Sequence, residues 1–233
     1  MSIVSAFGAT SPKTPIEPLN ITRRAVGAND VQIEIEYCGV CHTDIHISRN
    51  DWGGANYPVV PGHEIVGKVI GLGIDVHDLQ MGQRVAVGCF VDSCRTCSSC
   101  KLDLEQYCLN GFTASYGSPT EDEGGFTYGG YSESIVADRH FVLTVPENLD
   151  PAGAAPLLCA GITTYSPLKH WQIGPEKTVG IIGLGGLGHM GVKFAHAMGA
   201  HTVMITTSEK KGADAKALGA DEVLLSTDEQ AMA

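Results

Sequence analysis

An apolar run that leads into a glycine-rich turn limits the fold of this chain more than any other feature. The run KTVGIIG, residues 177–183, is typical of a buried strand. Gly183, Gly185 and Gly188 then match G-x-G-x-x-G where a helical pattern opens. Such glycines let a pyrophosphate approach backbone N–H groups at a helix N-terminus. The motif is weak alone, but its place between strand and helix predicts a dinucleotide-binding turn rather than a glycine-rich connection.

The rest of the chain after residue 150 alternates between helical and strand patterns. Helical spacing covers residues 187–200 and 210–220, and strand-like runs cover 201–208 and 221–226. Alternating strands and helices imply a parallel sheet. Residues 151–233 therefore predict an α/β domain with its first three strands, half of the usual six.

The first 150 residues have a different texture. Short strand-like runs, punctuated by Gly, Pro and Asp, cover residues 31–40, 64–73, 83–91, 131–138 and 141–146. Apolar and polar residues alternate in the first of these runs, as in a half-buried strand. We expect residues 1–150 to form a mainly antiparallel barrel or sandwich.

Composition excludes several classes of partner. The net charge of −11 argues against nucleic acid and anionic membranes. No apolar run reaches the roughly 18 residues of a membrane helix, and the N-terminus lacks the pattern of a secretory signal. We therefore expect a cytoplasmic protein with reduced cysteines.

Half of the eight cysteines lie in the stretch CRTCSSCKLDLEQYC. They are Cys94, Cys97, Cys100 and Cys108. Thiolates at these spacings converge on one tetrahedral zinc, and four protein ligands leave no position for catalysis. An iron–sulfur cluster uses similar ligands and stays an alternative. The spacing favours a structural zinc in a lobe around residues 92–110.

Three further residues suit a second zinc. Cys41 and His63 stand beside glycine-marked turns. Cys159 lies where the strand-rich first region meets the region of alternating helices and strands. Two thiolates and one imidazole leave an open fourth position, as alcohol dehydrogenation requires. Spacing alone is weak evidence here. Cys38 and Cys89 are interpreted as small buried hydrophobes, and no thioredoxin-like pattern follows C-x-x-C at Cys38.

The end of the second predicted strand bears on the choice of dinucleotide. No carboxylate stands at the strand end, where NAD would need one for its ribose 2′-hydroxyl. Thr207 and Ser208 stand there instead, with Lys211 close behind. This pattern favours NADP, although Ser208 could simply cap the next helix. Within the preceding turn we expect Gly186 and Leu187 to contact the cofactor as well.

Taken together, these motifs resemble zinc-dependent alcohol dehydrogenases of the medium-chain superfamily. The likeness is strongest to the cinnamyl alcohol dehydrogenase branch and bacterial NADPH-dependent aldehyde reductases. It rests on YCGVCHTDIH, YPVVPGHEIVG, CRTCSSC, LLCAGITTYSPL and GLGGLGH, and it spans the whole chain. The resemblance implies a GroES-like β-barrel catalytic domain followed by the first half of a Rossmann domain. It also implies two zinc ions and NADP(H).

The resemblance further implies a role for each matching residue of the catalytic domain. Cys41, His63 and Cys159 would bind catalytic zinc, with Glu64 as a transient ligand. Asp44 would orient His63 through the ring nitrogen that faces away from the metal.

Thr43 would hydrogen-bond the substrate oxygen, and His46 would pass its proton to solvent. The alternative interpretation is that His46 is only an exposed helix residue with no role in the reaction. Thr163 would contact the nicotinamide, and His42 the pyrophosphate. Trp52 would line the substrate pocket, although a lone Trp is as often a core residue.

The implied reaction is hydride transfer between NADP(H) and an aldehyde or primary alcohol, and full-length members would form homodimers. Members of the family run to roughly 350 residues by resemblance, so this chain of 233 lacks their last part. A noncatalytic zinc-binding fragment of a truncated or split dehydrogenase is therefore an alternative. A polyol dehydrogenase is the enzymatic runner-up.

Overall fold

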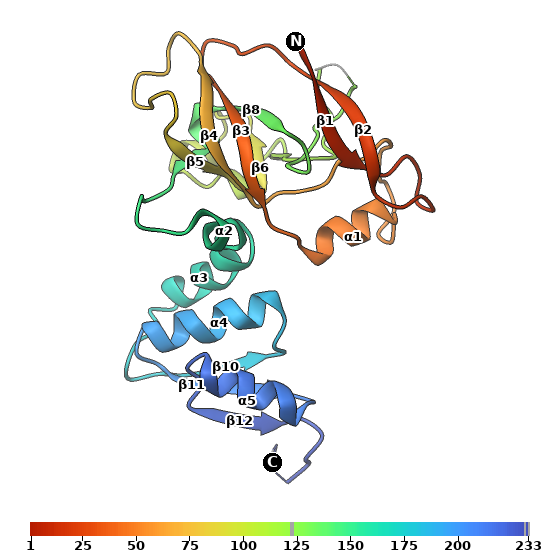
Figure 1. Cartoon of the computed structure of the whole chain (residues 1–233). Coiled ribbons are helices and arrows are strands. Elements are labelled where there is room, and N and C mark those ends of the chain that lie inside the picture. The colour runs from red at the N-terminus through yellow and green to blue at the C-terminus, as the bar shows by residue number, and fades with distance from the viewer. Residues whose placement is uncertain (122–123, 231, 233) are drawn as a thin grey trace. The chain divides into compact units, whose positions relative to one another are not determined.

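The chain divides into two compact units, Met1–Cys159 and Ala160–Ala233. The computed structural model describes residues 1–121, 124–230 and 232 (Figure 1). The first unit extends past residue 150 because the short helices α2 (Pro151–Ala154) and η4 (Ala155–Leu158) belong to it. Ala154 and Ala155 pack against Val66 and Ala86 of its main sheet.

The main sheet of the first unit has five antiparallel strands. Their order is β8 (Ser134–Asp138), β3 (Asp30–Cys38), β4 (Ile65–Leu72), β5 (Arg84–Val87) and β9 (Val142–Thr144). Val31, Ile33, Ile65 and Ile135 are among the side chains of its buried core. Each such side chain contributes about 1.5 to 3 kcal/mol when fully buried.

Two smaller ribbons complete this unit. β1 (Ser2–Gly8) pairs with β2 (Glu17–Arg23), and β6 (Phe90–Asp92) pairs with β7 (Thr113–Ala114). The second ribbon encloses residues 93–112, so it closes the loop that carries four cysteines. Three single-turn helices lie in or near this loop: η1 (Cys100–Leu102), η2 (Glu105–Tyr107) and η3 (Arg139–Phe141).

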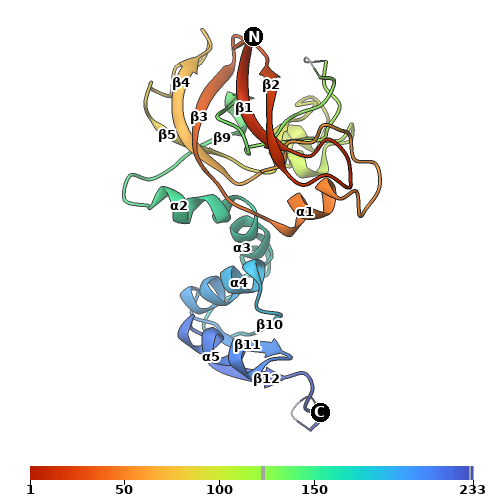
Figure 2. The ribbon, with the colours of Figure 1, turned by 45° about the vertical axis from the view of Figure 1, so that its right-hand side comes forward.

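Helix α1 (His42–Ser48) begins directly after Cys41. The backbone N–H of Cys41 donates to the Asp44 carboxylate at 2.9 Å, which closes the first turn of the helix. In Figures 1 and 2 the helix lies at the end of the β1–β2 ribbon where β1 finishes. Its Ile47 packs against Ala9, Val59 and Tyr116 there.

The second unit contains a parallel sheet of three strands in the order β10 (Thr178–Ile182), β11 (His201–Thr206) and β12 (Glu222–Leu225). Its helices are α3 (Ala160–His170), α4 (Gly186–Ala197) and α5 (Glu209–Ala217). Val192 of α4 and Ala215 of α5 both pack on Met204 of β11, so both helices cover the same face.

The predicted fold class, an antiparallel sheet followed by half of a doubly wound sheet, is confirmed. One boundary differs, because α4 ends at Ala197 rather than near residue 200. Gly199 has a φ of 82°, a left-handed conformation that ends the helix and suits glycine. Within the described ranges, none of the helices has both the length and the apolar character to cross a bilayer.

Candidate metal centres

Four cysteine sulfurs meet in the loop between β6 and β7. The Sγ atoms of Cys94, Cys97, Cys100 and Cys108 all lie within 4.8 Å of one another. The Sγ of Cys100 is 3.9 Å from that of Cys94 and 3.5 Å from that of Cys97. Zn–S bonds of about 2.3 Å in a tetrahedron place sulfurs about 3.8 Å apart. The thiols are free, so the loop has metal-site spacing rather than disulfide bonds.

Local backbone geometry holds this set in place. The N–H of Cys97 donates to the Cys94 sulfur at 3.4 Å, and the N–H of Leu109 donates to the Cys97 sulfur at 3.5 Å. The backbone N–H groups of Thr96 and Cys97 lower the pKa of Cys94 to about 5. A lowered pKa favours the thiolate, which is the form that binds metals.

A second set is assembled from three segments of the first unit. Cys41 precedes α1, His63 and Glu64 precede β4, and Cys159 follows η4. Their ligand atoms lie within 4.8 Å of one another, and the sulfurs of Cys41 and Cys159 are 4.0 Å apart. His63 and Glu64 are buried, whereas both cysteines are half-buried. The structure therefore brings together all four residues that the resemblance assigned to one zinc.

His63 is oriented by a hydrogen bond to Asp44. Its Nδ1 lies 3.1 Å from Oδ1 of Asp44, which leaves Nε2 for the ligand set. Burial acts to lower the pKa of His63, but without a metal the hydrogen bonds and negative charges of Asp44 and Cys159 raise it. Burial also acts to raise the pKa of Asp44, but its hydrogen bonds to His63 and Cys41 keep it below the usual value.

The carboxyl group of Glu64 occupies space that only glycine at position 39 leaves open. A Cβ on Gly39 would lie 1.9 Å from Oε2 of Glu64. The backbone N–H of Gly39 also donates to the Glu64 carbonyl at 2.9 Å. Burial is the main cause that raises the pKa of the Glu64 carboxyl. The sequence marks Gly39 as a turn residue, but nothing in it indicates the contact with Glu64.

The remaining predicted residues of the first unit lie on or just after α1. His42 is exposed, Thr43 is half-buried, and His46 follows Thr43 by one turn. Nδ1 of His46 lies 2.9 Å from Oδ2 of Asp51, a residue that the sequence did not single out. The ring of Trp52 lies 4.9 Å from that of His46, and its 62% exposure shows that it is not a core residue.

The glycine-rich turn of the second unit joins β10 to α4. Gly183 has a φ of 83°, Gly185 is the N-cap of α4, and Gly186 and Leu187 open the helix. Gly188 is buried, and a Cβ there would lie 1.9 Å from the carbonyl oxygen of Gly183. The close approach of helix and strand therefore requires glycine at 188.

Strand β11 ends at Thr206, and Thr207, Ser208 and Lys211 follow it without a carboxylate at the strand end. Ser208 is the N-cap of α5 but makes no side-chain capping hydrogen bond. Thr207 and Lys211 are exposed. Thr163, on α3, is exposed as well and belongs to this second unit.

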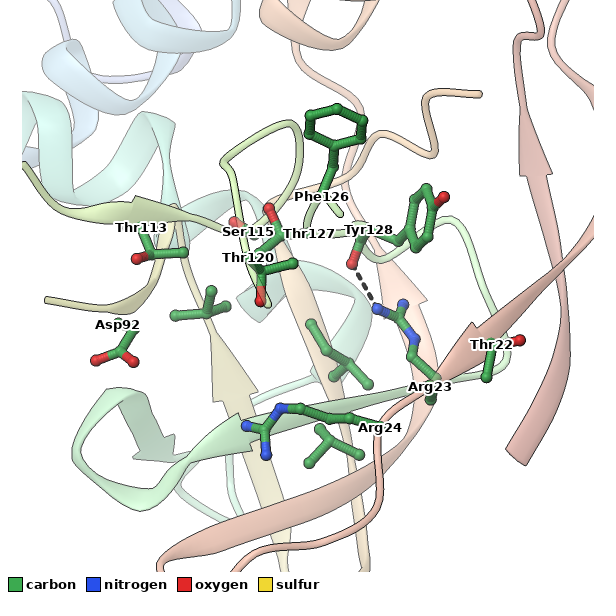
Figure 3. A pocket seen from close by; sticks show the side chains of 13 residues that line it. Thr22, Arg23, Arg24, Asp92, Thr113, Ser115, Thr120, Phe126, Thr127 and Tyr128 are labelled. Carbon is green, nitrogen blue, oxygen red and sulfur yellow. Dashed lines mark hydrogen bonds between the residues drawn. The ribbon is translucent and has the colours of Figure 1, made fainter. Parts of the chain in front are cut away.

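A small cavity of about 90 Å³ in the first unit is separate from both cysteine sets. Arg23, Thr22, Ser115 and Tyr128 are among its lining residues (Figure 3). None of the eight metal-ligand candidates lines it.

Fold and site together define a metal-binding dehydrogenase class, and comparison with known proteins agrees. Residues 27–147 match the alcohol dehydrogenase GroES-like domain family, and residues 186–233 match the zinc-binding dehydrogenase family. The chain belongs to the zinc-containing medium-chain alcohol dehydrogenases, in the branch that includes the cinnamyl alcohol dehydrogenases. The predicted family is thus confirmed.

Two curated relatives illustrate the likeness. The chain is 57% identical over 231 residues to aldehyde reductase YahK of Escherichia coli, covering 99% of this chain and 66% of the relative. It is 53% identical over 229 residues to NADP-dependent alcohol dehydrogenase C 1 of Mycolicibacterium smegmatis, covering 98% and 65%. The chain thus spans just under two thirds of the length of each of these relatives.

Two solved structures share the fold. A cinnamyl alcohol dehydrogenase of Sorghum bicolor (SbCAD4) superposes with a TM-score of 0.95 at 44% identity, over 99% of this chain and 66% of that one. The Helicobacter pylori enzyme, complexed with NADP(H), gives a TM-score of 0.91 at 40% identity, over 95% and 64%.

Proposed function

We propose that this chain binds two zinc ions and carries the metal site and part of the cofactor site of an NADP(H)-dependent aldehyde reductase. In this proposal residues 1–150 are the catalytic domain and residues 151–233 are the partial dinucleotide-binding domain. The observation that carries it is the convergence of Cys41, His63, Glu64 and Cys159 within 4.8 Å. For a chain of full family length we propose a homodimer.

The donor atoms of both sets suit zinc. Thiolate and imidazole are its preferred ligands, four thiolates are typical of structural sites, and two thiolates with one imidazole are typical of alcohol dehydrogenases. Cys41, His63 and Cys159 would hold the ion, and the Glu64 carboxylate lies within reach as a transient ligand. When bound, zinc supplies Lewis acidity that polarises a carbonyl oxygen.

Residues on α1 would transfer the proton between the substrate oxygen and solvent. The Thr43 hydroxyl would donate to the substrate oxygen, and His46 would relay a proton between this region and solvent. Asp51 supports the role of His46, because its carboxylate lies 2.9 Å from Nδ1 and orients the imidazole ring. Trp52, whose ring lies beside that of His46 at a tilt of 31°, would line the entry for the substrate.

The second unit would bind the dinucleotide. The pyrophosphate would bind at the N-terminus of α4, against Gly183, Gly185, Gly186, Leu187 and Gly188. His42 would be a further contact. Thr207, Ser208 and Lys211 would bind a 2′-phosphate, which favours NADP(H). Thr163 would contact the nicotinamide, and bound NADPH supplies the hydride that reduces the carbonyl carbon.

The test is reduction of benzaldehyde by the purified chain, with its zinc content measured by mass spectrometry. We expect two zinc ions per chain and turnover that prefers NADPH to NADH. Cys41→Ser should lose one zinc and all turnover, and the matched control Cys38→Ser should keep both. Full activity in Cys41→Ser would remove the assignment of the second set.

The same experiment separates the alternatives. Two bound zinc ions without turnover, beside an active longer protein, would identify this chain as a noncatalytic zinc-binding fragment. A preference for polyols over aldehydes would favour a polyol dehydrogenase instead. One relative is named for a polyol substrate: the probable mannitol dehydrogenase of Fragaria ananassa, to which the chain is 50% identical.

A further inference from the structure

The carboxylate of Asp44 is surrounded by an unusual number of hydrogen-bond donors. The residue is 1% exposed. Its Oδ1 accepts from the Gly62 N–H at 3.0 Å, from His63 Nδ1 at 3.1 Å and from the Tyr116 hydroxyl at 2.8 Å. Its Oδ2 accepts from the Cys41 N–H at 2.9 Å and from the Tyr131 hydroxyl at 3.1 Å. Five donors thus meet a group with about four lone-pair positions.

We propose that Tyr116 and Tyr131 are positioning residues for the second metal set, acting through Asp44 on His63. The two phenols approach different oxygens of one carboxylate, so together with the backbone donors they fix its plane. A fixed plane holds Oδ1 against Nδ1 of His63, and the imidazole then presents Nε2 to the metal. This inference rests on the proposed function, because it assumes that the set holds zinc.

The position of Tyr131 is set by the same strand-like contacts that place His63. The N–H of Gly129 donates to Val60, that of Gly130 to Gly62, and that of Tyr131 to Pro61, at 2.7, 2.8 and 2.9 Å. Three backbone hydrogen bonds therefore join segment 129–131 to the segment that ends at His63. Displacement of one segment would move both the phenol and the imidazole.

A buried arginine fastens the other side of this segment. The guanidinium of Arg23, on β2, donates to the carbonyls of Tyr128, Gly129 and Ser134 at 2.6, 2.8 and 2.8 Å (Figure 3 shows the first). It also donates to the Ser132 hydroxyl at 2.7 Å. The residue is only 7% exposed, so these neutral acceptors replace the water that the cation loses. Arg23 thus anchors the turn that presents Tyr131.

Tyr116 reaches Asp44 from a different direction. It is 7% exposed and packs with Ala9 and Val59, and its ring lies 5.9 Å from that of His63. The N–H of the preceding Ser115 donates to the Cys89 carbonyl at 3.0 Å, which ties this segment to the connection between β5 and β6. The two phenols therefore come from two segments, 114–118 and 127–131, which backbone hydrogen bonds between Gly117, Ser118 and Thr127 join to each other.

The test uses Tyr116→Phe, Tyr131→Phe and the double variant, each of which removes a hydroxyl and keeps the ring. Tyr128→Phe is the matched control, because it loses a hydroxyl in the same segment without touching Asp44. The zinc dissociation constant is measured by competition with a chelator, and the absorption spectrum is recorded after cobalt substitution. Loss of partners in the layer behind a metal ligand typically weakens binding about 10- to 100-fold.

We expect each single variant to weaken zinc binding at the second set about 10-fold and the double variant more, with a shifted cobalt spectrum. The four-cysteine set should keep its affinity in every variant, and Tyr128→Phe should match the wild type. Unchanged affinity and spectrum in both single variants would overturn the proposal. So would equal losses at both zinc sets, since that pattern means general destabilisation. A wild-type chain that binds only one zinc would instead refute the proposed function itself.

Discussion

The two cysteine-containing sets of this chain are built in opposite ways. Cys94 to Cys108 span one loop, and backbone N–H groups of that loop hold the sulfurs. Cys41 and Cys159 are 118 positions apart, and side chains from several strands and loops support the set between them. A local set depends mainly on its own turns, whereas a dispersed set depends on the packing of the whole first unit. The difference predicts which substitutions harm stability and which harm chemistry.

The largest effect is expected for Cys97→Ser. In the proposed function this loop holds a zinc ion that contributes folding free energy, so removal of one thiolate should lower the melting temperature by on the order of 10 °C. Calorimetry measures the shift. Ser98→Ala is the control, since Ser98 is exposed between two of the ligands. A Cys97→Ser chain that melts like the wild type but loses catalytic rate would reverse the roles assigned to the two sets.

A smaller effect, confined to the dispersed set, is expected for Gly39→Ala. The new methyl would collide with the Glu64 carboxylate, so that carboxylate must leave its position. We expect about 10-fold weaker zinc binding at this set, comparable to the loss of a supporting contact. The four-cysteine set should be unaffected.

Chelator titration of the Gly39→Ala protein measures both sites at once. Gly174→Ala is the control, because a Cβ there meets nothing within 4 Å. Loss of zinc from the four-cysteine loop in Gly39→Ala would contradict the separation of the two sets.

The smallest effect is expected for Asp30→Asn, at the first residue of β3. Asp30 accepts from both terminal nitrogens of the Arg24 guanidinium and from the N–H of Gly27. Burial acts to raise the pKa of Asp30, but these hydrogen bonds and the nearby arginine charges lower it. The substitution should therefore cost about 1.5 kcal/mol at pH 7.

The pH dependence gives this prediction its sign. A lowered pKa in the folded chain adds stability above the unfolded value of about 3.9 and loses it as the pH falls through the folded value. Wild type and Asp30→Asn should therefore converge in denaturant unfolding as the pH falls below the lowered pKa of Asp30 in the folded chain. Zinc binding by the four-cysteine loop should not change at pH 7. A stability difference that grows on acidification would contradict the assigned cause.

Asp51 and Gly39 illustrate what sequence reasoning missed. Asp51 lies five residues after His46 and outside its helix, so no helical spacing connects the two side chains. Gly39 looks like an ordinary turn residue until the position of Glu64 is known. Tyr116 and Tyr131 likewise carry no local signal, because their contacts to Asp44 span 72 and 87 positions.

The sequence by itself determined the features whose physics is local. Cysteine spacing defines a four-thiolate loop, and a strand followed by G-x-G-x-x-G defines a parallel sheet with a phosphate-binding turn. Alternating apolar residues define the antiparallel strands of the first unit.

Only the tertiary structure decided which distant side chains meet. It brought Cys159 to Cys41, two phenols to one carboxylate, and Arg23 to the turn behind Tyr131. Such contacts depend on strand register and packing, which no short segment encodes. For this reason the candidate metal ligands and Asp44 could be named from motifs, whereas the other residues that hold them in place could not.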